Sequence, residues 1–104
     1  MSALECLQDW YLAQCDGTWE HDHGIRVETL DNPGWMVEVD LTGTDLENAP
    51  FEEFVVERLD EDWVHARVVE TADPVRRRFE AFCGPRSLTE ALEIFLAWAE
   101  SPEG

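Results

Sequence analysis

The stretch that decides the fold reads Trp35-Met36-Val37-Glu38-Val39-Asp40-Leu41, and in it apolar and polar residues alternate. Because successive side chains of a β-strand point to opposite faces of a sheet, this alternation predicts a strand with one buried and one solvated face. Met36, Glu38 and Asp40 are expected on the solvated face. The other four residues are expected to meet a hydrophobic core.

Four further stretches have strand character, and they lie at residues 25–30, 51–59, 63–69 and 75–83. A turn signal, Asp31-Asn32-Pro33-Gly34, separates the first of them from residues 35–41, and Pro33-Gly34 suits the middle of a type II turn. Short connections of this kind imply antiparallel neighbours.

The pairing register of the first two strands follows from their patterns. Their inward residues must share a face, so the numbers of paired residues must sum to an even value. A sum of 66 would place Glu28 opposite Glu38, and like charges directly opposite one another are destabilising. A sum of 64 places Arg26 opposite Glu38, and we predict this register.

Helices are predicted at both ends of the strand region, over residues 3–15 and 88–100. Apolar residues recur at helical spacing in both, and Ser87 with Glu90 matches a capping box at the start of the second. Two amphipathic helices need an apolar partner surface, which one sheet face supplies. We therefore predict an α+β fold over residues 1–104 as one domain: a five-stranded antiparallel sheet with the N-terminal and C-terminal helices packed on one face.

Composition and charge exclude several classes of partner. The 104 residues include 24 acidic and 7 basic side chains, for a net charge of −17. Nucleic acid and anionic membranes would repel such a chain, so we expect neither as a partner. No apolar run approaches the roughly 20 residues that a membrane helix needs, and no basic region typical of a secretory signal is seen near Met1.

The three cysteines, Cys6, Cys15 and Cys83, form no CxxC motif. We interpret them as reduced thiols of a cytoplasmic protein, packed as small hydrophobic residues. Cys83 would become a nucleophile if His65 approached it, but a buried thiol at the end of a strand is the simpler interpretation.

The most suggestive cluster for metal chemistry is His21-Asp22-His23. On an extended segment both imidazoles would point the same way and could meet one cation. Three or four ligands must converge on zinc, however, and an H-x-H pair alone has no characteristic spacing. We prefer a solvent-exposed loop, and we assign no catalytic, metal or cofactor-binding residue.

Surface carboxylates and tryptophans are the remaining candidates for a binding site. The outward positions of the first three strands carry Glu28, Glu38, Asp40 and Glu57, whereas Trp19 and Trp63 lie at loop or strand edges. The plain interpretation is a solvated face with packing at its rim. The alternative is a partner-binding surface in which a tryptophan acts as a desolvated anchor.

Several motifs together resemble a known family. They are Leu7-x-x-Trp10-Tyr11, Gln14-Cys15-Asp16-Gly17-x-Trp19-Glu20-His21-x-x-Gly24-Ile25, Thr29-Leu30-Asp31-Asn32-Pro33-Gly34-Trp35, Asp40-Leu41-x-Gly43-Thr44-x-Leu46 and Glu93-Ile94-Phe95-Leu96-x-Trp98. In these residues the chain resembles immunity protein family 53, a group of bacterial polymorphic-toxin immunity proteins. The resemblance is specific at residues 10–46 and weak at about 60–82, which include Arg76, Arg77 and Arg78.

The resemblance implies a cytoplasmic, non-enzymatic antidote that binds and neutralises a cognate toxin domain. Combined with the net charge, it leads us to expect that an acidic surface meets a cationic toxin surface. The predicted partner-binding residues are Trp19, Glu28, Glu38, Asp40, Glu57 and Trp63. The alternative is a small metal-dependent hydrolase that uses His21 and His23.

Overall fold

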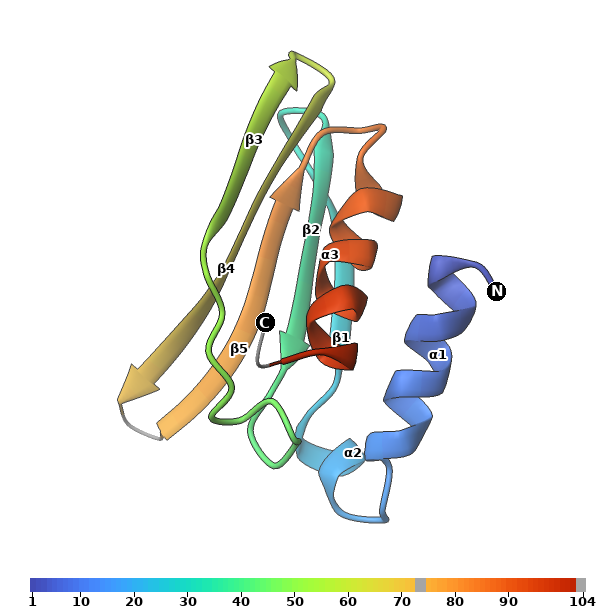
Figure 1. Ribbon diagram of the computed structural model, residues 1–104, viewed down its shortest axis with the longest axis vertical. Helices are drawn as coiled ribbons and strands as arrows, with labels where there is room; N and C mark the ends of the chain where they lie inside the picture. Colours follow the sequence, from blue (N-terminus) through green and yellow to red (C-terminus); the bar gives the residue numbers. More distant parts are fainter. Residues whose placement is uncertain (73–74, 103–104) are drawn as a thin grey trace.

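The computed structural model describes residues 1–72 and 75–102, and it contains three helices and five strands in these parts of the chain (Figure 1). The elements are α1 (Ala3–Gln14), α2 (Trp19–Asp22), β1 (Ile25–Leu30), β2 (Gly34–Asp40), β3 (Phe54–Leu59), β4 (Asp62–Ala72), β5 (Val75–Cys83) and α3 (Leu88–Glu100). The predicted α+β fold with its antiparallel sheet and its terminal helices is confirmed. The additional element is the single turn of α2.

The sheet has the strand order β1-β2-β5-β4-β3, and all neighbours are antiparallel. The last strand in the chain is therefore the central strand of the sheet, between the β1–β2 hairpin and the β3–β4 hairpin. Arg26 pairs with Glu38 in the β1–β2 register, as predicted.

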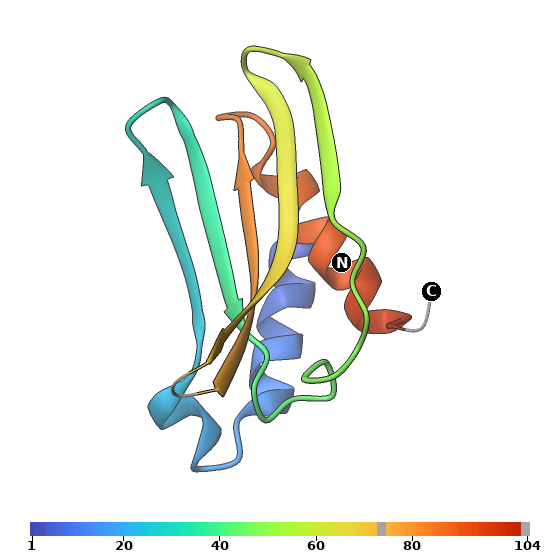
Figure 2. The ribbon, with the colours of Figure 1, turned by 90° about the vertical axis from the view of Figure 1, so that its left-hand side faces the viewer.

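The two long helices lie on the same side of the sheet (Figures 1 and 2). Helix α3 packs directly on β2, β4 and β5, whereas α1 packs mainly on α3. The opposite face carries no helix, and we call it the open face. Within residues 1–72 and 75–102, every helix falls short of the length and apolar character that a membrane crossing needs.

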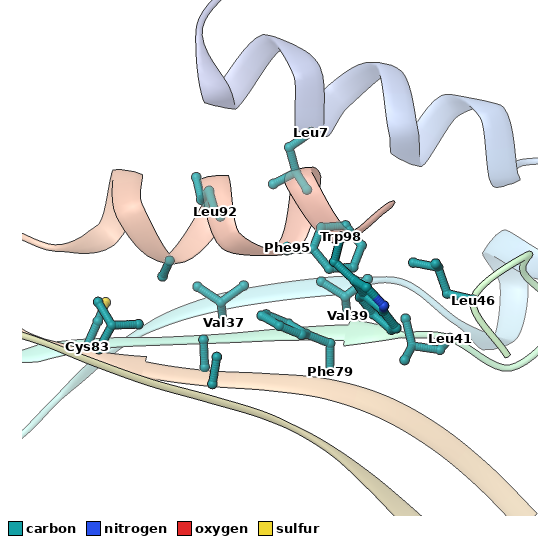
Figure 3. Close-up of a cluster of buried hydrophobic side chains, with 14 residues drawn as sticks. Leu7, Val37, Val39, Leu41, Leu46, Phe79, Cys83, Leu92, Phe95 and Trp98 are labelled. Carbon is teal, nitrogen blue, oxygen red and sulfur yellow. The ribbon is translucent and has the colours of Figure 1, made fainter. Parts of the chain in front are cut away.

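The core lies between the sheet and α3 (Figure 3). Phe79 of β5 and Phe95 of α3 are fully buried, and their ring centroids are 5.2 Å apart. Phe51 was predicted to begin the third strand, but it precedes β3 and turns inward, where its ring packs edge-on against Phe79 and Trp98. Burying such large aromatic surfaces is the main stabilising contribution in a domain of this size.

The capping box predicted at Ser87 and Glu90 is not present. Ser87 makes no side-chain cap, and its hydroxyl donates to Asp62 Oδ1 at 3.2 Å. Glu90 forms an ion pair with Arg58, which also binds Asp62 at 2.8 Å. Both capping residues are thus drawn into contacts with the β3–β4 hairpin. A capping box is present at α1, where Ser2 and Glu5 bind each other's backbone N–H groups.

The role predicted for Gly34 in a type II turn is also wrong, because its φ is not positive. The structure gives a different reason for glycine at this position. A Cβ on Gly34 would lie 2.4 Å from the carbonyl oxygen of Cys83. The absent side chain lets β2 approach the end of β5.

Candidate functional site

The centre of the open face is a ladder of paired charges rather than a free acidic surface. Glu38 lies 3.4 Å from Arg26 and 3.3 Å from Arg78, and Glu80 lies 3.0 Å from Arg78 and 3.2 Å from Arg67. The side chains of Glu38 and Glu80 are only 12% and 10% exposed. Because β5 is the central strand, its arginine neutralises both carboxylates. Glu38, a predicted partner-binding residue, is thus committed to contacts within the sheet.

Asp40 is likewise engaged within the protein. Its carboxylate accepts a hydrogen bond from the backbone N–H of Gly24 at 2.9 Å and lies 3.9 Å from His23 Nδ1. Arg76 Nη1 lies 3.2 Å from the same imidazole nitrogen. These contacts hold the chain entering β1 against the end of β2.

Trp19 is buried, with 5% of its surface exposed. Its indole N–H donates to the carbonyl oxygen of Thr42 at 3.0 Å, and its ring packs edge-on against Trp10. The short helix α2 turns this side chain inward. Trp19 therefore lies in the interior of the structure and is not presented as a surface anchor.

The histidines of the candidate metal cluster do not lie on an extended segment. His21 lies in α2 and is exposed, whereas His23 caps the helix. His23 has an extended backbone, and its ring packs against Trp19. In the described residues, no three His, Cys, Asp or Glu side chains are grouped as metal ligands.

Cys83 and His65 lie on opposite faces of the sheet. Cys83 pairs with Val64, and His65 pairs with Phe82, so the thiol points toward the core and the imidazole toward the open face. Burial raises the pKa of the Cys83 thiol to about 11. The imidazole and the thiol are therefore not paired as a base and a nucleophile. Cys83 is a buried thiol at the end of β5, which is the simpler of the two interpretations.

One end of the open face is hollowed between the two hairpins. Strand β5 ends at Cys83, while the β1–β2 and β3–β4 hairpins continue past it (Figure 2). The hollow has a volume of about 460 Å³. A second hollow adjoins it beside the β3–β4 hairpin and shares Trp63 and His65. We call the two together the notch, and its lining residues are Leu30, Asp31, Asn32, Glu57, Leu59, Asp60, Trp63, His65 and Phe82.

The notch brings together two of the predicted binding residues, Glu57 and Trp63, which lie directly opposite each other on β3 and β4. The Trp63 and His65 rings meet edge to face at 5.3 Å, and His65 Nε2 lies 2.9 Å from Glu57 Oε1. The Glu57 side chain remains 67% exposed. The rings of Trp63 and His65, which we call the aromatic wall, thus lie next to the accessible carboxylate of Glu57.

The notch is acidic. Asp31, Glu57 and Asp60 line it, and none of its described lining residues is an arginine. A third hollow, which shares His65 and Phe82 with the notch, is lined by Arg67, and this arginine is paired with Glu80. Arg58, the nearest arginine in sequence, is paired with Asp62 and Glu90 outside the notch. Glu28, a predicted binding residue of the same face, is half exposed and lies 2.6 Å from Arg26.

His65 and Phe82 were missed as binding candidates by sequence analysis. A signal was present for Phe82: the alternation of residues 79–83 places this large apolar side chain on the solvated face. An outward aromatic residue at the end of a strand is typical of a contact surface. His65 and Phe82 pair directly across β4 and β5, and the sequence alone does not specify that pairing.

These features describe a small α+β protein with an acidic, aromatic hollow on an uncovered sheet face. The sequence profile described as Immunity protein 53 matches residues 4–100. The chain therefore belongs to the Immunity protein 53 family, as its motifs indicated, and its general role is that of an immunity protein. Searches of curated proteins and of solved structures gave no match.

Proposed function

We propose that this protein binds a cognate toxin domain and neutralises it, without catalysis, by covering a cationic surface of that toxin with the notch end of its open face. Family membership supports the role of an antidote. The choice of surface rests on the notch, whose two adjoining hollows are together lined by three carboxylates, three aromatic rings and, among the described residues, no arginine.

The charge distribution supports this choice over the centre of the sheet. At the centre, Glu38 and Glu80 are already neutralised by arginines, so a partner would have to break existing ion pairs to reach them. The Glu57 side chain is 67% exposed, whereas Glu28 is paired with Arg26 and lies outside the notch lining. Of the predicted binding residues, the proposal therefore keeps Glu57 and Trp63, and adds Asp31 and Asp60.

The net charge of −17 gives the association a long-range component. Opposite charges steer two proteins together and raise the association rate. At 0.1 M salt this attraction is largely screened between charges more than about 10 Å apart. We place the encounter in the cytoplasm of the producing cell, where the three free cysteines would stay reduced.

The proposal is tested with the toxin domain encoded by the neighbouring reading frame. A triple variant, Asp31→Asn, Glu57→Gln and Asp60→Asn, should weaken binding about 10- to 100-fold and abolish protection of cells that express the toxin. The matched control is Asp9→Asn, Glu93→Gln and Glu100→Gln on the two helices, which removes the same charge elsewhere. It should stay within about threefold of the wild type.

Two results would overturn the proposal. One is an association rate that does not fall as ionic strength rises. The other is an equal effect of the two triple variants, which would show that total charge matters and the notch does not.

A further inference from the structure

The three aromatic side chains of the notch are not needed to fill the core. Trp19, Trp35 and Trp98 each donate their indole N–H to a backbone carbonyl oxygen, of Thr42, Pro85 and Pro50. The indole N–H groups of Trp10 and Trp63 make no hydrogen bond with the described residues, but Trp10 packs against the core, whereas Trp63 belongs neither to the core nor to the residues packed on it. The Trp63 ring lies beside Gly84 and meets the imidazole of His65 at an interplanar angle of 67°.

A row of side chains crosses the open face at the base of the notch. The pairings Glu28–Met36, Met36–Phe82 and His65–Phe82 place these four residues side by side. An aromatic ring thus forms the base, and Trp63 lies near it at the start of β4. Met36, Trp63 and Phe82 are each partly exposed, and adjoining apolar groups at a protein surface mark binding sites on soluble proteins.

Glu57 adds a charged group at one side of the aromatic wall. Its Oε1 atom faces His65 Nε2 at 2.9 Å, while Oε2 has no partner among the described residues. The imidazole holds the carboxylate beside the Trp63 ring. Aromatic faces with a neighbouring carboxylate are the surroundings that stabilise a partly desolvated organic cation.

From these contacts we propose that the notch accepts one arginine side chain of the toxin, with its guanidinium against Trp63 and Phe82 and its charge balanced by Glu57. Arginine fits better than lysine, because its planar group stacks on aromatic rings and binds a carboxylate through two N–H groups. This inference deepens the proposed function and rests on it for the identity of the partner. It assigns the notch a specific ligand chemistry, beyond general charge attraction.

The first test uses the isolated protein and no toxin. The indole N–H signals of the five tryptophans are followed by NMR while Nα-acetyl-arginine amide is added. The Trp63 signal should shift in a saturable way, and Nα-acetyl-citrulline amide, a neutral molecule of the same shape, should leave it unchanged. Nα-acetyl-lysine amide should bind more weakly than the arginine compound.

Glu57→Gln should weaken the arginine response at least about threefold without affecting the fold, because this side chain is exposed. Equal shifts with arginine and citrulline, or a Trp63 signal that does not move, would refute the arginine site. That result would not contradict the proposed function, which is the neutralisation of the toxin.

The second test measures binding of the toxin domain by Trp63→Leu and Phe82→Leu. We expect each to raise the Kd at least about tenfold, mainly through faster dissociation, because aromatic anchors carry much of an interface's binding energy. Leu12→Ser, at an exposed position of α1, is the control and should bind as the wild type does. Near-UV circular dichroism verifies that each variant is folded.

The outcomes separate the two proposals. If the wild type binds the toxin but Trp63→Leu and Phe82→Leu bind equally well, the arginine site is wrong and the proposed function stands. If the wild type does not bind or neutralise the toxin, the proposed function fails, whatever the NMR titration shows.

Discussion

Arg78 Nε lies 3.3 Å from Glu38 Oε2, across the pairing of β5 with β2. The contact joins two residues 40 positions apart in the chain, and it explains how the sheet tolerates a strongly acidic sequence. Arg78 also binds Glu80 at 3.0 Å, so a single guanidinium serves two nearly buried carboxylates.

The Arg78 contacts predict a loss of stability in Arg78→Met. Two carboxylates would lose a cation while remaining about 90% covered, and the expected decrease in the free energy of unfolding is about 1–3 kcal/mol. Urea unfolding measures it. Arg86→Met is the control, since Arg86 is 85% exposed, and it should change stability by less than about 0.5 kcal/mol. Equal effects of the two substitutions would show that the ladder is not stabilising.

Gly34→Ala and Gly84→Ala are expected to destabilise the protein by about 1–3 kcal/mol each. The added Cβ would lie 2.4 Å from a backbone carbonyl oxygen, of Cys83 in the first case and of Glu61 in the second. Gly24→Ala is the matched control, because no atom lies within 4 Å of its Cβ and its φ is not positive. Thermal unfolding should leave this control within about 1 kcal/mol of the wild type. A tolerated Gly84→Ala would contradict the close approach of β5 to the β3–β4 turn.

The contact between Arg58 and Asp62 predicts a specific pH dependence. Hydrogen bonds from Arg58 lower the pKa of Asp62, and the Ser87 hydroxyl contributes in the same direction. Because the pKa is depressed in the folded state, the stabilisation is present above the unfolded value of about 3.9 and is lost as pH falls through the folded value. Arg58→Met should therefore be less stable than the wild type near pH 6, and the difference should shrink as the pH falls through the lowered folded value. Urea unfolding near pH 6 and at successively lower pH provides the measurement, and a difference independent of pH would contradict the prediction.

The cysteines should differ in reactivity. Burial raises the pKa of Cys83 to about 11 and leaves it 0% exposed, whereas Cys6 and Cys15 are partly exposed. Since the thiolate is the reactive form, a thiol reagent at about pH 8 should modify Cys83 at least about 100-fold more slowly than the other two. Mass spectrometry of partly labelled protein distinguishes the sites. Labelling of all three cysteines at one rate in the folded protein would argue against the buried position.

The positions of the candidate binding residues were predicted in part. Glu57 and Trp63 were expected to contribute, and they lie together in the notch. Glu38 and Asp40 were correctly placed on the open face, but their ion pairs and hydrogen bonds depend on Arg78 and on Gly24. A carboxylate in a sequence carries no information on whether a cation from a distant strand will reach it.

Local patterns determined much of this protein's architecture: five strands, two terminal helices, and the β1–β2 register with Arg26 opposite Glu38. They did so because side-chain periodicity and the charges of adjacent strands act over short separations along the chain. Only the tertiary structure decided that β5 lies at the centre of the sheet, that Trp19 is buried and that Ser87 binds Asp62. Those outcomes depend on which apolar surfaces cover one another best in the folded chain, a competition among distant segments that local patterns do not specify.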